Sequence, residues 1–166
     1  NNASCAVVSS SAALLSHRHG KEIDSHDVII RLEDAPTEGY EDHVGSRTTL
    51  RAGPALWSTL HEGSSSGGSF DLDAQSVRDA LLRQLFPDKQ HEMSTMTLAP
   101  TAGFVGMLVA MLLCRTVDAY EMAPPLEGES ATRTYYANSP ARASAALPPM
   151  LPYEHALWVR LASGNW

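Results

Sequence analysis

Strand-like and helix-like stretches alternate along this chain of 166 residues. Short runs of apolar and β-branched residues predict strands, and longer amphipathic or apolar runs predict helices. The expected strands are residues 6–8, 27–32, 47–51 and 117–122. The first expected helix ends near residue 15, and the others span residues 73–86, 101–114 and 153–162. This alternation is typical of an α/β fold, in which helices cover both faces of a mostly parallel, Rossmann-like sheet. The sequence shows no internal repeat, and we expect one domain over residues 1–166.

The first expected strand runs directly into a turn of small residues. Its sequence, CAVVSSSAALL over residues 5–15, places three serines at 9–11 between the strand and a helix. Ligands of open α/β sheets bind beyond the carboxyl ends of the strands, where a helix N-terminus can approach an anion such as phosphate. Residues 100–103, PTAG, predict a second turn of this kind, with Thr101 as the helix cap. Tight helix–strand packing without a ligand explains both turns equally well at this stage.

Charge and hydropathy exclude two classes of partner. The net charge of −7 argues against a nucleic-acid surface, which is normally basic. The longest apolar run, residues 104–114, is too short to span a bilayer and is typical of a buried helix. The first residues do not resemble a signal peptide or an anchor. We therefore expect no nucleic acid and no membrane contact by this segment.

Two groups of residues invite a metal interpretation. Asp71 and Asp73 have the spacing of the metal-binding pair of many nucleotide-sugar transferases. A helix N-cap and a loop carboxylate explain them better. His17, His19 and His26 lack the carboxylate or thiolate that completes a familiar ligand spacing. We therefore expect no metal.

Composition leaves the state of the cysteines open. The chain contains two cysteines, Cys5 and Cys114. They are either two buried thiols or one disulfide that closes a long loop, and a disulfide would require an oxidising compartment.

Several segments, taken in order, form one recognisable pattern. Residues 5–51 contain CAVVSSSAALL, GKEIDSHDVIIRL, DAPT and VGSRTTLR, and residues 100–124 read PTAGFVGMLVAMLLCRTVDAYEMAP. Residues 134–136 are TYY, and residues 151–154 are LPYE. In this order and spacing, the segments resemble the long, small, tyrosine-pair and last sialyl motifs of the eukaryotic sialyltransferases. The similarity is greatest to the beta-galactoside alpha-2,6-sialyltransferase class.

The resemblance implies a fold, an activity and a location. Family members adopt an α/β/α sandwich, a variant of the glycosyltransferase-A fold, and use CMP-sialic acid without a metal. They transfer sialic acid, with inversion, to a terminal galactose of a glycoprotein or glycolipid. They reside in the Golgi lumen behind an N-terminal anchor, so the resemblance implies that this chain is a luminal catalytic fragment without its anchor. The family's motif cysteines are joined, which here implies a Cys5–Cys114 disulfide.

The motif positions also imply site residues. The serine turn would cradle the nucleotide, the second turn would bind the donor from the opposite side, and the tyrosine pair would lie near the phosphate. For the tyrosine pair, a short strand with one buried ring is an equally good interpretation. The expected donor-binding residues are Ser9, Ser10, Ser11, Glu33, Thr101, Ala102, Gly103, Tyr135 and Tyr136.

The chain departs from the family pattern at positions that matter for chemistry. Ala12 replaces a glycine, and Glu33 replaces a donor-binding asparagine, although Arg31 on the same strand face would pair with it. Pro149 stands where the family has its general-base histidine. His155 is then a weak candidate base, with an ordinary first-turn helix residue as the alternative. These departures keep a second hypothesis open, namely an impaired relative that binds nucleotide or glycan without turnover.

Overall fold

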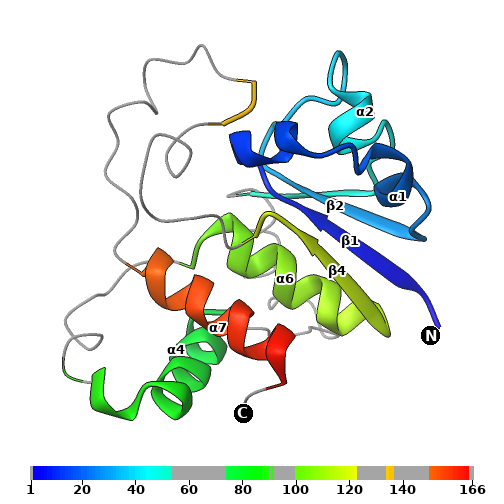
Figure 1. Cartoon of the computed structure of the whole chain (residues 1–166). Coiled ribbons are helices and arrows are strands. Elements are labelled where there is room, and N and C mark those ends of the chain that lie inside the picture. Colours follow the sequence, from blue (N-terminus) through cyan, green and yellow to red (C-terminus); the bar gives the residue numbers. More distant parts are fainter. Residues whose placement is uncertain are drawn as a thin grey trace, which may run out of the picture.

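The sheet is the centre of the fold. The computed structural model describes residues 2–53, 74–89, 91, 100–122, 134–136 and 150–164. Its four strands have the order β3-β2-β1-β4, and every pairing is parallel (Figure 1). The strands are β1 (Ser4–Val8), β2 (Val28–Leu32), β3 (Leu50–Ala52) and β4 (Thr116–Tyr120). The parallel α/β sheet expected from the alternation is confirmed.

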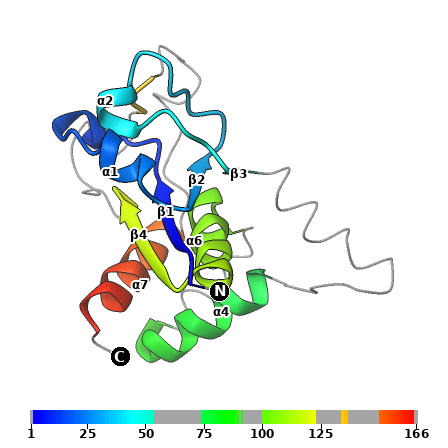
Figure 2. The same cartoon turned by 90° about the vertical axis from the view of Figure 1, so that its right-hand side faces the viewer.

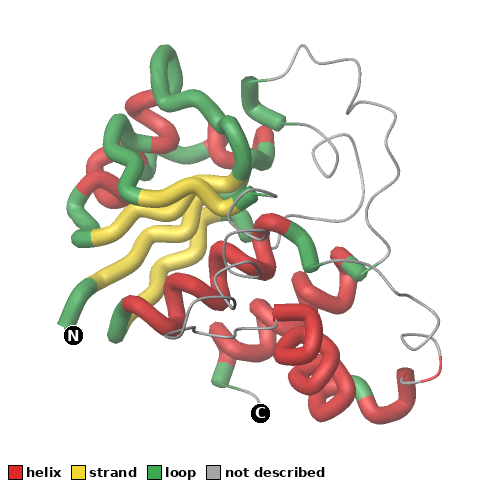
Figure 3. Tube along the Cα trace, turned by 180° about the vertical axis from the view of Figure 1, so that it is seen from behind, coloured by secondary structure: helices red, strands yellow, loops and turns green. Residues whose placement is uncertain are grey.

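Helices cover both faces of the sheet. Short helices lie on one face of the sheet, and longer helices lie on the other side (Figures 2 and 3). The first group is η1 (Ala12–Ser16), α1 (Gly20–Asp24) and α2 (Glu41–Val44). The second is α4 (Ala74–Leu85), α6 (Ala102–Leu113) and α7 (Leu151–Ser163), with the 3₁₀ turn η3 (Pro87–Lys89) after α4. This arrangement is a three-layer α/β/α sandwich.

Alternate side chains of β1 build a separate hydrophobic core on each face. Cys5 and Val7 pack in the cluster that contains α6, whereas Ala6 and Val8 pack in the cluster that contains α1 and α2. All four side chains are at most 1% exposed. Because side chains of a strand point alternately to opposite faces, a strand buried on both faces is a continuous apolar run.

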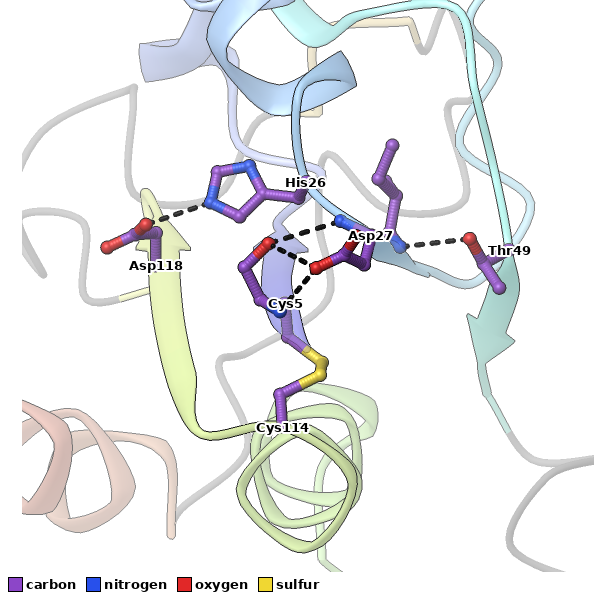
Figure 4. Close-up of a disulfide and its surroundings, with 8 residues drawn as sticks. Cys5, His26, Asp27, Thr49, Cys114 and Asp118 are labelled. Carbon is purple, nitrogen blue, oxygen red and sulfur yellow. Dashed lines mark hydrogen bonds and ion pairs between the residues drawn. A yellow bond between two sulfur atoms is a disulfide. The ribbon is translucent and has the colours of Figure 1, made fainter. Parts of the chain in front are cut away.

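The two cysteines form a disulfide. Cys5 of β1 is bonded to Cys114, the residue that ends α6, across a Cα–Cα distance of 5.8 Å (Figure 4). The bond joins the first strand to the far end of the helix that crosses it. The pairing implied by the family resemblance is confirmed.

The predicted boundaries hold within a few residues, with two exceptions. The segment after the serine turn is a 3₁₀ helix, and the third strand begins only at Leu50. The short helices α1 and α2, with 5 and 4 residues, were not predicted because so few residues show no periodicity. Asp71, Asp73 and Pro149 lie outside the described residues.

Asp24 anchors the loop that leads into β3. Its carboxylate accepts hydrogen bonds from Ser46 N at 2.8 Å, Ser46 Oγ at 2.9 Å and Arg47 N at 2.9 Å. Gly45, at φ +75°, turns the chain beside this carboxylate, where a Cβ would lie 2.5 Å from Asp24 Oδ1. Burial alone would raise the pKa of Asp24, but these hydrogen bonds outweigh it and hold the pKa below its ordinary value of 3.8.

We expect Asp24→Asn to lower the free energy of unfolding at pH 7 by about 1–3 kcal/mol, because an amide nitrogen cannot accept the Ser46 bonds. A lowered pKa in the folded state stabilises the fold above the unfolded pKa, and this stability is lost as the pH falls. The difference between the two proteins should therefore shrink from about pH 5 downward through the folded pKa. Urea unfolding at pH 7 and pH 3 measures it. Asp34→Asn, in an exposed loop, is the control; an equal loss there would contradict the prediction.

Candidate functional site

The sheet topology places a site at the carboxyl ends of β1 and β4. The chain moves from β1 outward to β2 and β3 and then returns to the other side of β1 to form β4. In open α/β sheets, ligands bind in the crevice where the strand order reverses. The serine turn follows β1, and the N-terminus of α6 is at the same end of the sheet, so both predicted anion-binding turns lie at this point.

The serine turn is held by its own hydroxyl groups. Ser9 Oγ accepts Ser11 N–H at 3.0 Å, and Ser11 Oγ caps η1 by accepting Ala13 N–H at 3.2 Å. Ser9 N–H donates to Tyr120 O of β4 at 3.1 Å, which joins the turn to the neighbouring strand end. Because each of these hydroxyls acts here as an acceptor, its own proton can still be donated to a ligand oxygen.

The first turn of α6 is capped and closely packed. Thr101 Oγ1 accepts Phe104 N–H at 3.1 Å, as the sequence predicted. A Cβ on Gly103 would lie 3.0 Å from Met122 Cε and 3.7 Å from Leu32 Cδ1, so glycine lets the helix approach the ends of β2 and β4. The first N–H groups of a helix have no intrahelical acceptor, and together with the helix dipole they favour an anion at this end.

A glutamate with left-handed backbone follows each of the two strands that flank β1. Glu33 follows β2 and Glu121 follows β4, and each has φ +52°. Arg51 Nη1 donates to Glu33 O at 2.9 Å and so holds this turn. Residues other than glycine rarely adopt positive φ, and such backbone is concentrated at functional sites.

The expected pairing of Arg31 with Glu33 is wrong. Arg31 is 0% exposed, and its guanidinium donates to Arg47 O and Thr48 Oγ1. The positive φ of Glu33 ends the regular alternation of β2, so the two side chains do not share a strand face.

The tyrosine pair lies against the serine turn. Thr134 bridges Ser11 in antiparallel fashion, and Tyr135 N–H donates to Ser10 O at 3.1 Å. Tyr135 is buried, its hydroxyl donates to Pro36 O at 2.6 Å, and burial raises its pKa to about 12. The ring of Tyr135 therefore supports the turn from behind, while Tyr136 is half-buried beside it.

Glu154 joins α7 to the N-terminus of α6. Its carboxylate accepts hydrogen bonds from both the backbone N–H and the hydroxyl of Thr101. Arg78 Nη1 of α4 lies 3.8 Å from Glu154 Oε1, and both side chains are 1% exposed. Burial raises the pKa of Glu154 despite these partners. Sequence reasoning assigned no role to Glu154 or Arg78; only the position of Glu154 in the last motif pointed to it.

His155, the candidate base, follows the first turn of α7 and is 8% exposed. Its Nδ1 is buried and has no hydrogen-bond partner among the described residues. Burial lowers the pKa of its imidazole, which favours the neutral form that can accept a proton.

A pocket of about 270 Å³ opens beside the carboxyl end of β4. It is lined by His19, Glu22, Asp118, Ala119, Tyr120 and Glu121. Next to it, His26 Nε2 lies 2.8 Å from Asp118 Oδ2 (Figure 4). Three carboxylates in the lining repel an anion, so this pocket does not suit a phosphate. Within the described ranges, no cluster of three or more metal-ligating side chains is found, and no helix is long and apolar enough to cross a membrane.

The fold and the converging turns define an α/β protein of the class that holds ligands beyond the carboxyl ends of parallel strands. Residues 1–67 match the model of glycosyltransferase family 29 (sialyltransferase). The family model and the curated relatives described next support the assignment of this chain to the sialyltransferase family.

Two of the curated relatives that the chain matches carry one and the same name. The chain is 31% identical over 163 residues to a Xenopus tropicalis protein named beta-galactoside alpha-2,6-sialyltransferase 2, with 72% of this chain and 32% of the relative covered. It is 27% identical over 213 residues to the Rattus norvegicus protein of that name, with 98% and 39% covered. The chain thus spans about a third of the length of the curated relatives that it matches.

Solved structures share the fold. A crystal structure of a mammalian sialyltransferase superimposes with a TM-score of 0.61 at 20% identity, covering 99% of this chain and 67% of the other. A mammalian sialyltransferase in complex with Gal-beta-1-3GalNAc-ortho-nitrophenol gives a TM-score of 0.59 at 18% identity, with the same coverage. At these identities the likeness establishes the fold, and the expected sialyltransferase variant of the α/β fold is confirmed.

Proposed function

We propose that this chain is a single catalytic domain that transfers sialic acid from CMP-sialic acid to a terminal galactose of a glycan. The observation that carries the proposal is that the serine turn after β1 and the N-terminus of α6 lie at the same end of the sheet, at its topological switch point. The match to the sialyltransferase family supports a sugar-nucleotide donor, and the names of the relatives favour a beta-galactoside acceptor.

The chemistry of the donor fits the residues at these two turns. CMP-sialic acid carries a phosphodiester and a carboxylate, so its site needs anion-binding groups. The hydroxyls of Ser9, Ser10 and Ser11 would donate to the nucleotide, and the N–H groups of Ala102 and Gly103 would face the phosphate. The acceptor oxygen attacks the anomeric carbon with inversion, the bond to the phosphate oxygen breaks, and CMP leaves. Stabilisation of the departing phosphate by oriented N–H groups accelerates this step without a metal.

The acceptor hydroxyl must lose a proton in this reaction. Pro149 cannot accept one, and it lies outside the described residues. We assign the proton to His155, whose neutral imidazole is adjacent to the Glu154 that contacts the α6 cap. Toward the residues that the structure describes, Nδ1 has an unused lone pair or proton, in keeping with a role toward a substrate.

A second candidate function is a protein that binds nucleotide or glycan without turnover. Two residues favour it: Pro149 at the position of the base and Glu33 at the donor end of β2. The two candidates make the same prediction for binding and opposite predictions for transfer.

The proposed location is the Golgi lumen, with a glycoprotein or glycolipid glycan as the partner. The Cys5–Cys114 bond supports this location because disulfides persist in oxidising compartments.

The deciding experiment is NMR of CMP-sialic acid mixed with the disulfide-intact protein and a galactoside acceptor. Release of CMP with a new sialoside supports the transferase. Broadening of the donor signals without release supports the binding protein. Unchanged donor signals would contradict the transferase and the nucleotide-binding protein, and the acceptor signals would then show whether the chain binds the glycan alone.

We expect Glu33→Asn to tighten CMP binding by about 10- to 100-fold, as part of the ~4 kcal/mol repulsion between two like charges 4 Å apart is removed. An amide can also donate a hydrogen bond to the phosphate, and asparagine adopts positive φ more readily than glutamate. Titration of CMP by NMR gives the Kd. Glu38→Asn removes one charge from an exposed loop position and is the control; the same gain there would show that net charge, not position, is responsible.

A further inference from the structure

Three helices contribute to one buried polar cluster at the N-terminus of α6. Arg78 comes from α4, Glu154 from α7, and Thr101 caps α6. The links are Arg78 Nη1 to Glu154 Oε1 at 3.8 Å, Glu154 Oε1 to Thr101 N at 3.3 Å, and Glu154 Oε2 to the Thr101 hydroxyl. This polar cluster ends at the first turn of α6, which we assign to the donor phosphate.

Because this polar cluster is buried, its charges depend on one another. Arg78 and Glu154 are each 1% exposed, so water does not compensate either charge. Asp79 accepts from Nε and Nη2 of Arg78 at 3.0 and 2.8 Å, whereas Nη1 has no hydrogen-bond partner among the described residues. That edge of the guanidinium therefore serves Glu154 through its charge. Removal of one partner of a buried pair leaves an uncompensated charge and is far more costly than loss of an exposed pair.

The Thr101 hydroxyl has two roles, which explains how the polar cluster acts on α6. It accepts Phe104 N–H as the helix cap, and it donates its proton to Glu154. Glu154 therefore orients the hydroxyl that caps α6, and it also accepts a hydrogen bond from the Thr101 N–H. A shift of Glu154 would change both bonds, and with them the direction of the first-turn N–H groups.

We propose that Arg78 is a positioning residue that holds the Glu154 carboxylate on the Thr101 cap and so fixes the first turn of α6 for the donor phosphate. This inference rests on the proposed function for the identity of the ligand. The alternative is that Arg78 and Glu154 only join α4 to α7. That alternative predicts a loss of stability without an effect on the cap.

The test uses the full disulfide-intact chain, with CMP as the probe. We expect Arg78→Met to raise the Kd for CMP by about tenfold or more, and Arg78→Lys to recover most of this loss because it keeps the charge. In the ligand-free protein, Arg78→Met should also accelerate hydrogen exchange at the Thr101 amide while the amides of β1 stay protected. The control is Arg83→Met, an exposed position on the same helix, which should change neither readout.

Unchanged CMP binding and unchanged Thr101 exchange in Arg78→Met would overturn the proposal, as would equal losses at Arg78 and Arg83. If Arg78→Met does not fold, the double variant Arg78→Met/Glu154→Gln, which removes both charges of this buried pair, replaces it. A Kd equal to that of the wild type in this variant overturns the proposal, and a clearly weaker one supports it. If the wild type binds no CMP, the proposed function is wrong, and Thr101 exchange alone then decides whether Arg78 holds the cap.

Discussion

Replacement of both Cys5 and Cys114 by alanine is expected to lower the free energy of unfolding by about 4–5 kcal/mol. The bond closes a loop between residues separated by 109 positions, so its loss gives the unfolded chain a large amount of conformational entropy. A domain of ordinary stability has about 5–15 kcal/mol in total, so the expected loss is a large fraction of it. Urea unfolding of the oxidised protein and of the double variant measures the difference.

Reduction provides the matched control for this prediction. A thiol reductant should lower the unfolding midpoint of the wild type toward that of the double alanine variant, and should leave the variant itself unchanged. Alanine is preferred to serine because Cys5 is 0% exposed and a buried hydroxyl would add its own cost. A midpoint that does not move on reduction would contradict the disulfide's role in stability.

Pro149→His is expected to raise the rate of sialic acid transfer by about 10²–10⁴-fold. Family resemblance puts the general base at this position, and an imidazole can take the proton that proline cannot. Residue 149 lies outside the described residues, so the prediction rests on the motif and not on geometry. Release of CMP together with formation of the sialoside, followed by NMR, measures the rate.

Two variants make this prediction sharp. Pro148→His, at the adjacent proline, adds the same side chain one residue away and should leave the rate unchanged. His155→Ala should abolish the residual activity of the wild type if His155 is the present base. Equal gains at 148 and 149 would indicate that an added imidazole acts nonspecifically. A binding-only protein would show no transfer in any of these variants.

The elements with strong local patterns were predictable. β2 is rich in apolar and β-branched residues, and α6 is an apolar stretch preceded by a capping threonine and ended by Cys114. By contrast, α1 and α2 are too short for periodicity. They are stabilised by contacts such as Asp24 with the loop before β3, which connect positions 22 or more residues apart.

The sequence by itself determined the order of the elements, the family and the two turns that face the proposed donor, because each of these is written in contiguous residues. Only the tertiary structure decided which distant side chains meet. It directed the Tyr135 hydroxyl to Pro36, 99 positions away, and Glu154 to Thr101, 53 positions away. It also separated the side chain of Arg31 from that of Glu33, although the two residues are close in the sequence. Contacts of this kind depend on how helices pack across the sheet and on backbone angles at strand ends, and no local pattern of residues encodes either.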